Sequence, residues 1–152
     1  MSDVSRIDHV GITTSDLDRS LHFYVDLLGL RLLSRNLLSG PDLAALLGFE
    51  AAAIDNADLD SGDGRVLELM QYVQPAAKRV AYQSSDAPTT HIAFTVADLH
   101  AVTERLTEAG VEIISRRPLK IHDPGGAWDG VQCLYIRDPD GVILELVQRP
   151  GR

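Results

Sequence analysis

This sequence has little cysteine, few aromatic residues and no long apolar run. Its one cysteine, Cys133, excludes an intramolecular disulfide framework and fits a reducing compartment. As a single thiol within VQCLYI, Cys133 is interpreted as a small buried apolar residue. The apolar runs span only a few residues, and the N-terminal MSDVSRIDHV lacks the apolar core of a signal peptide. We therefore expect a cytoplasmic protein and no membrane partner.

Basic residues are also in deficit. The chain has 14 Lys and Arg against 22 Asp and Glu, which gives a net charge of -8. Nucleic acids and anionic membranes both require a basic face, so we expect neither as a partner. With 152 residues and 45% hydrophobic residues, the chain is long enough to bury a core as one domain spanning 1–152. A small-molecule substrate is the partner that these numbers leave.

The sequence contains an internal repeat. The stretch DHVGITTSDL resembles THIAFTVADL, which places His9 and His91 at equivalent positions 82 residues apart. Each copy also ends in an LEL triplet, centred on Glu68 and Glu145. The histidine lies 59 positions before the glutamate in the first copy and 54 in the second. Duplication of one supersecondary unit explains these matches, and a short helix inserted at 41–48 accounts for the difference.

Hydrophobic periodicity predicts an α+β fold with two tandem βαβββ modules, at 6–73 and 89–148, joined by a connector at 74–88. Each module is expected to begin with a strand and a capped helix that ends at a glycine, Gly29 or Gly110. The expected strands are 6–14, 30–38, 50–59 and 65–73, then 89–96, 111–115, 131–138 and 142–148. A short helix at 41–48 and a loop or ragged strand at 116–130 complete the prediction.

Strand alternation places the repeated histidines and glutamates on a face of small residues. His9 shares its side of the strand with Gly11 and Thr13, whereas the bulky neighbours face the opposite way. The small side is free to line a cavity. A carboxylate within an apolar strand is costly unless it is solvated, paired or bound to a cation. Any one of these residues alone is explained equally well by a structural role.

The coincidence of all four polar residues at matching places in the repeat favours a metal site. The predicted ligands are His9, Glu68, His91 and Glu145. Two imidazoles and two carboxylates suit a borderline divalent ion such as Zn, Ni, Co, Mn or Fe(II).

The chain resembles the vicinal oxygen chelate superfamily, which includes glyoxalases, bleomycin-resistance proteins and extradiol dioxygenases. The resemblance runs from about residue 7 to 147 and is carried by DHVGITTSDLDRSLHFYVDLLGLRLL, VLELMQY, THIAFTVADL and YIRDPDGVILEL. It implies two βαβββ modules that form a curved mixed eight-stranded sheet around a metal cavity, with the same four ligands. It also implies a homodimer.

The resemblance implies an isomerase or lyase of the glyoxalase or epimerase type. Such an enzyme acts on a small oxygenated carbon acid through an enediolate or enolate, with Glu145 and secondarily Glu68 as the base. One alternative is an extradiol Fe(II) dioxygenase, whose terminal pattern is matched by Tyr135, Pro139, Gly141 and Glu145, although its preceding histidine is missing. A second alternative is a bleomycin-resistance-like binding protein without catalysis.

Four further residues are candidates for the substrate pocket: Met70, Tyr72, Trp128 and Tyr135. Met70 and Tyr72 share the Glu68 side of their strand, and Trp128 lies in the glycine-rich HDPGGAWDG loop. His22 and His100 are expected on helix surfaces. Arg35 is a candidate contact for an anionic substrate.

Overall fold

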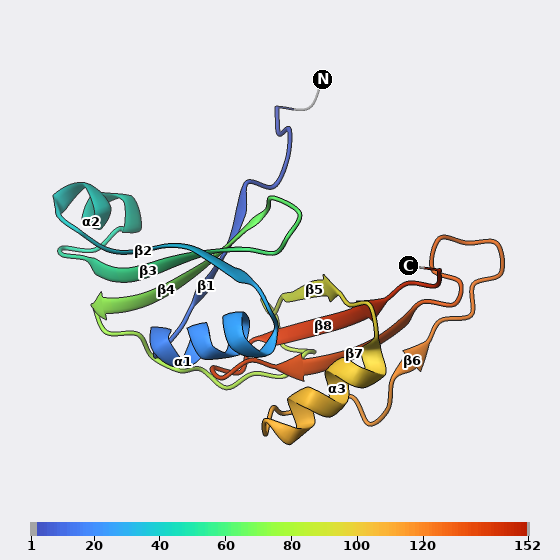
Figure 1. The fold of residues 1–152 in the computed structure, drawn as a ribbon. Helices are drawn as coiled ribbons and strands as arrows, with labels where there is room; N and C mark the ends of the chain where they lie inside the picture. Colours follow the sequence, from blue (N-terminus) through green and yellow to red (C-terminus); the bar gives the residue numbers. More distant parts are fainter. Residues whose placement is uncertain (1–2, 152) are drawn as a thin grey trace. The chain divides into compact units, whose positions relative to one another are not determined.

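The computed structural model describes residues 3–151 and divides the chain into two compact units, residues 1–80 and 81–152. Each unit contains one βαβββ module and its own four-stranded mixed sheet (Figure 1). The predicted fold class, two tandem βαβββ modules with eight strands, is confirmed. The eight strands form two separate four-stranded hydrogen-bonded sheets.

The first unit forms its sheet in the order β1-β4-β3-β2, with β1 parallel to β4 and the other pairs antiparallel. Helix α1 and the π-helix η1 lie between β1 and β2, and α2 lies between β2 and β3. The bounds are β1 His9–Thr13, α1 Leu17–Leu21, η1 His22–Leu27, β2 Arg31–Ser39, α2 Pro41–Leu47, β3 Ala53–Asp60 and β4 Val66–Gln74.

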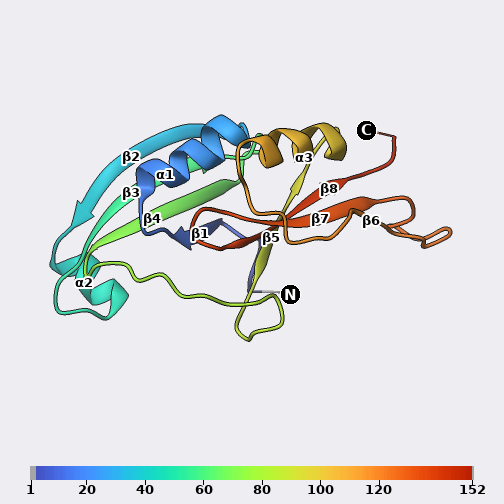
Figure 2. The same ribbon diagram turned by 90° about the horizontal axis from the view of Figure 1, so that it is seen from below.

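The second unit repeats this topology without the inserted helix. Its sheet has the order β5-β8-β7-β6, and β5 is parallel to β8. Helix α3 packs against β8, and Figure 2 shows it beside the strands of its own sheet. The bounds are β5 His91–Thr95, α3 Leu99–Glu108, β6 Leu119–Lys120, β7 Gln132–Arg137 and β8 Ile143–Gln148.

The first helix of each unit starts at an aspartate. Asp16 Oδ1 accepts from the Arg19 N–H at 3.0 Å, and Asp98 Oδ1 accepts from the Ala101 N–H at 3.0 Å. Both bonds satisfy amides that have no partner within the helix. The first helix differs from the sequence prediction in its second half, which is a π-helix over His22–Leu27. Hydrophobic spacing does not distinguish this wider turn from an α-helix.

The predicted strand at 111–115 is wrong. In its place is a single bridge between Ile113 and Ile136. The amides of Ile114 and Ser115 both donate to the Tyr135 carbonyl, at 2.8 and 3.2 Å, and the Ser115 hydroxyl accepts from the Tyr135 N–H at 2.8 Å. A side-chain oxygen thus replaces a backbone carbonyl and interrupts the ladder. The edge strand forms later, as β6, within the segment predicted as a loop or ragged strand.

The apolar core of each unit lies on the helix side of its sheet. Leu67 and Leu69 flank Glu68 and are buried, as are Leu144 and Leu146 around Glu145. Each glutamate therefore points to the opposite face of the sheet, as the alternation predicts. Within residues 3–151, no helix is both long enough and apolar enough to cross a membrane.

Candidate metal site

The first unit brings His9 and Glu68 together. The two residues lie on the parallel strands β1 and β4, and His9 Nε2 is 3.6 Å from Glu68 Oε2. Gly11 stands directly opposite Glu68. A Cβ atom on Gly11 would lie 2.8 Å from the terminal methyl of Met70 and 3.4 Å from Glu68 Oε2. Glycine at this position therefore leaves room for both side chains.

Asp8 contacts the other nitrogen of the His9 ring. Asp8 Oδ1 lies 3.2 Å from His9 Nδ1, and this bond to Asp8 is the main reason why the pKa of His9 is raised. The pKa of Asp8 is lowered in return, mainly by its bond to His9. A carboxylate on one imidazole nitrogen orients the ring and leaves the other nitrogen free to bind a metal. The sequence analysis missed Asp8, although its place beside a predicted ligand is a usable signal.

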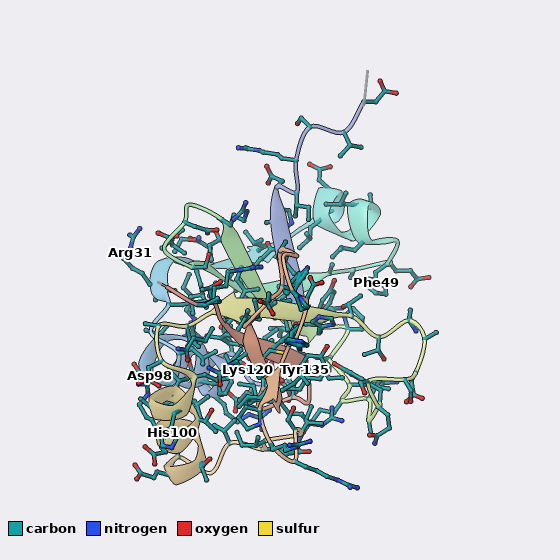
Figure 3. All side chains as sticks on the ribbon, turned by 90° about the vertical axis from the view of Figure 1, so that its right-hand side faces the viewer. Arg31, Phe49, Asp98, His100, Lys120 and Tyr135 are labelled. Atoms are coloured by element: carbon teal, nitrogen blue, oxygen red, sulfur yellow. The ribbon has the colours of Figure 1, made fainter. Side chains whose placement is uncertain are left out.

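The second unit brings His91 and Glu145 together in the same way. These residues lie on the parallel strands β5 and β8, and His91 Nε2 is 3.3 Å from Glu145 Oε2. Tyr135 stands opposite Glu145 on β7, and its ring centroid is 5.2 Å from that of His91. Burial, and then the charge of Glu145, raise the pKa of the Tyr135 phenol. Figure 3 labels Tyr135 on this strand.

Cys133 contacts the same glutamate. Its thiol is hydrogen-bonded to Glu145, and burial followed by this contact raises the pKa of the thiol to about 11. A thiol with so high a pKa is protonated at neutral pH and donates to the carboxylate. The sequence analysis interpreted Cys133 as a buried apolar residue. The structure shows instead a half-buried thiol with a polar partner.

The donor atoms of the two pairs fit divalent-ion coordination. Two ligands at about 2.1 Å from one ion are about 3.0 Å apart at an octahedral angle and about 3.4 Å apart at a tetrahedral angle. The nitrogen–oxygen distances of 3.6 and 3.3 Å are close to these values. Within residues 3–151, no cluster of three or more His, Cys, Asp or Glu side chains could hold a metal ion. Each unit therefore supplies two donors.

The remaining pocket candidates have different surroundings. Met70 lies over Gly11 on the Glu68 side of the sheet, and the Tyr72 ring forms an edge-to-face pair with Phe49, with centroids 6.2 Å apart. Trp128 is 48% exposed, and the Arg149 guanidinium lies 4.8 Å from the centre of its ring.

The surface positions predicted for His22 and His100 are confirmed. Their side chains are 66% and 82% exposed, and each forms an i,i+4 pair with an acidic residue, Asp26 or Glu104. Figure 3 labels His100 on α3.

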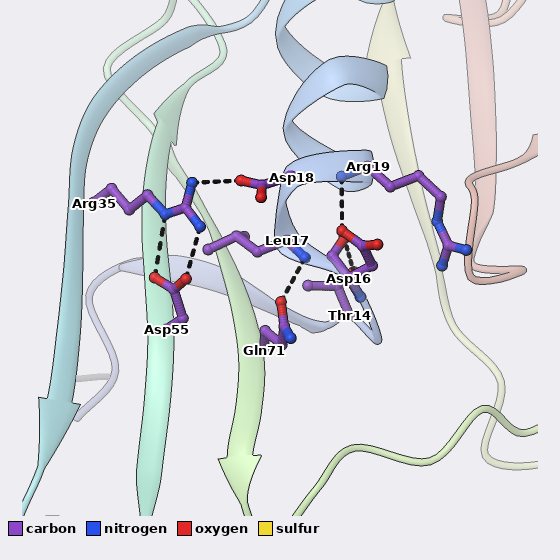
Figure 4. Close-up of polar contacts among 8 residues, drawn as sticks. All are labelled: Thr14, Asp16, Leu17, Asp18, Arg19, Arg35, Asp55 and Gln71. Carbon is purple, nitrogen blue, oxygen red and sulfur yellow. Dashed lines mark hydrogen bonds and ion pairs between the residues drawn. The ribbon is translucent and has the colours of Figure 1, made fainter.

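Arg35 does not have the role expected from the sequence. Its guanidinium contacts Asp55 at 2.7 Å and Asp18 at 2.5 Å, and both contacts raise its pKa (Figure 4). Asp18 belongs to α1, so these contacts lie on the helix side of the sheet, opposite the face of Glu68. Arg35 thus connects the helix to β2 and β3, and its charge is already balanced.

The paired βαβββ modules and the His–Glu pair on each set of parallel strands define a class of metal-binding α+β proteins that arose by duplication. The model of the Glyoxalase/Bleomycin resistance protein/Dioxygenase superfamily matches residues 6–146. The chain belongs to this superfamily, as its resemblance to the vicinal oxygen chelate proteins implied.

Similar proteins include enzymes. The chain is 31% identical to a 2-epi-5-epi-valiolone epimerase from an Actinomyces species over 149 residues, which cover 95% of this chain and 80% of that protein. It is also 31% identical to a probable lactoylglutathione lyase from Vibrio cholerae, with 94% and 90% covered. A glyoxalase family protein from Bacillus cereus has the same fold, with a TM-score of 0.83, 23% identity and coverage of 97% and 95%. The names support a family of enzymes that includes lyases and epimerases.

Proposed function

We propose that this protein is a divalent-metal-dependent isomerase or lyase and that His9, Glu68, His91 and Glu145 are its metal ligands. The observation that carries the proposal is the repetition of one arrangement. In each unit a histidine on the first strand approaches a glutamate on the last, at 3.6 Å and 3.3 Å. A duplicated fold does not require a polar pair at the same place twice, whereas a shared ligand role does.

The proposed substrate is a small carbon acid with adjacent oxygen atoms. A bound divalent ion would supply Lewis acidity for the negative charge that develops on the substrate oxygens. A carboxylate of the chain would remove the proton from the carbon beside the carbonyl and return it to give the isomer or the lyase product. Glu145 is the first candidate for this base and Glu68 the second. The names of an epimerase and a lyase among the relatives support this class of reaction.

Glu145 is the better candidate because of its neighbours. Its side chain is 17% exposed, against 23% for Glu68, and it lies beside the Tyr135 ring and the Cys133 thiol. Glu68 instead faces a second carboxylate, Asp58, across the strand pair. A thiol and a phenol are neutral neighbours, so a change in the charge of Glu145 does not meet a like charge there.

The test is metal analysis of the purified protein beside His9→Ala, Glu68→Gln, His91→Ala and Glu145→Gln. We expect about one ion per binding site in the parent protein and a marked loss in each variant. His100→Ala and Glu104→Gln are matched controls, because that exposed pair is also separated by 3.3 Å. Metal content that survives all four substitutions would contradict the proposal and favour a binding protein.

The reaction class is tested separately. Deuterium uptake at the α-carbon of hydroxyketones is the expected result for the metal-loaded protein. Oxygen consumption with catechols, measured with an electrode, would instead favour a dioxygenase. Glu145→Gln should lower the deuterium uptake more than Glu68→Gln does.

A further inference from the structure

A row of hydrogen-bond acceptors lies on β3 and β2 beside the His9–Glu68 pair. Asp58 stands directly opposite Glu68, and Ser34 stands opposite Asp58 on the next strand. The Ser34 hydroxyl donates to Asp58 Oδ2 at 2.9 Å, and the Asn56 amide donates to Asp58 Oδ1 at 3.3 Å. We call Ser34, Asn56 and Asp58 the acceptor strip. Both oxygens of its carboxylate are held by neighbours within the unit.

The orientation of the Asn56 side chain leaves its oxygen without a partner. A carboxylate accepts but does not donate, so the amide nitrogen must face Asp58 and Oδ1 must point away from it. Asn56 is 5% exposed, and its Oδ1 has no hydrogen-bond partner among the described residues. A buried acceptor without a donor is unfavourable, and such groups in folded proteins call for a specific explanation.

The strip also lacks a cation to balance its charge. Arg31 shares its edge of the sheet but is paired with Asp60 at 2.7 Å. Arg35 is bound to acidic residues on the opposite face. The face around Glu68 therefore offers oxygen acceptors and a surplus negative charge from Asp58, which favours ligands that donate hydrogen bonds and disfavours anions.

The second unit shows that the fold does not need the strip. The place of Asp58 opposite the glutamate is taken there by Tyr135, and Cys133 occupies the place of Asn56. The same βαβββ topology forms with a phenol and a thiol at these positions. An arrangement that one copy has and the other lacks points to a ligand rather than to folding.

We propose that the acceptor strip binds hydroxyl groups of the substrate, so that the substrate is an uncharged polyhydroxylated ketone rather than a carboxylate or a phosphate ester. This inference rests on the proposed function and names the substrate class of the same site. A ligand hydroxyl that donates to Asn56 Oδ1 satisfies the buried acceptor, and a second that donates to Asp58 uses its remaining lone pairs. A site built to accept such hydrogen bonds discriminates against analogues that lack the hydroxyl.

The experiment compares three probes by calorimetry with the metal-loaded protein. The probes are an inosose, which is an uncharged pentahydroxycyclohexanone, then 2-hydroxycyclohexanone as its poorly hydroxylated counterpart, and 2-oxoglutarate as an anion. We expect the inosose to bind at least about tenfold more tightly than either of the others. Equal or tighter binding of 2-oxoglutarate, or no measurable binding of the inosose, would overturn the inference.

Variants of Asn56 separate a ligand contact from a structural role. Asn56→Leu should lower inosose affinity about tenfold while the melting temperature stays level or rises, because an unpaired buried acceptor is removed. Ser20→Ala is the matched control. Ser20 is buried on the helix side of the same unit and bonded to Thr14, so this variant should lose stability and keep its affinity. Unchanged affinity in Asn56→Leu would contradict the strip.

Failure of the strip and failure of the proposed function give different results. Binding of the inosose requires no turnover, so the affinity ranking tests the strip even if no probe exchanges deuterium at its α-carbon. Exchange with all neutral ketones, without a preference for the hydroxylated one, would support the proposed reaction and overturn the strip alone.

Discussion

Gln71 Oε1 accepts a hydrogen bond from the Leu17 N–H at 2.7 Å, where the first helix begins (Figure 4). In the second unit, Gln148 Oε1 accepts from the Leu99 N–H at the same 2.7 Å. Each glutamine lies three positions after the glutamate of its strand and so points to the opposite face of the sheet. One strand in each unit therefore both presents a predicted metal ligand and fixes the start of the helix.

Removal of either glutamine should destabilise its unit. Gln71→Ala and Gln148→Ala leave a helix N-terminal amide without its partner, and each should lower the free energy of unfolding by about 1 kcal/mol. Urea denaturation followed by circular dichroism measures the change. Gln83→Ala is the control, because no hydrogen bond of its side chain is needed for a helix start, and it should have little effect. Equal losses in all three variants would contradict the role of these glutamines.

Asp8→Asn should weaken metal binding without removing a ligand. The carboxylate on His9 Nδ1 orients the ring, and loss of such a partner commonly costs about tenfold in metal affinity. Competition with a chromophoric chelator measures the affinity. Asp26→Asn makes the same change at His22, where Nδ1 and Oδ2 are 2.7 Å apart, and should leave the affinity as it was. A parallel drop in both variants would point to general electrostatics instead.

The Cys133 thiol should react slowly with alkylating reagents in the folded protein. Its pKa is raised from 9.0 to about 11 by burial and by Glu145. The reactive thiolate is populated above the pKa, so at pH 8 its fraction should fall roughly a hundredfold below that of a free thiol. Mass spectrometry after timed iodoacetamide treatment gives the rate, with the urea-unfolded protein as the reference. A folded-state rate equal to that reference would refute the raised pKa.

Asp138→Ala should cost more stability than a comparable change in the first unit. Asp138 is 5% exposed, and its Oδ1 accepts from the Asp140 and Val142 amides at 2.9 and 2.8 Å in the turn before β8. Loss of both bonds leaves two amides without acceptors, so we expect about 2–3 kcal/mol. Asp63→Ala, in the exposed turn before β4, should cost less than half of that in the same denaturation experiment. The reverse order would show that this turn is not a main source of stability.

The sequence predicted the repeat, the strand order of each module and the facing of His9, Glu68, His91 and Glu145, because these depend on alternation and on matched positions. It could not predict that Ser115 interrupts a strand, since that depends on a contact with Tyr135 across the sheet. It also missed Asp8 and the surroundings of Cys133. Both are effects of pairing between distant strands or of one ring nitrogen, which leave no periodic signal.

The pairing of the first strand with the last in each sheet has a consequence for synthesis on the ribosome. β1 pairs with β4 alone, and β5 pairs with β8 alone. The strand that carries His9 is made first but has no backbone partner until residues 66–74 have emerged. Each histidine strand therefore waits for its glutamate strand, and the first sheet can complete its hydrogen bonds while the second is still being translated. Folding in the order of translation would then join each His–Glu pair in the last step of its own unit.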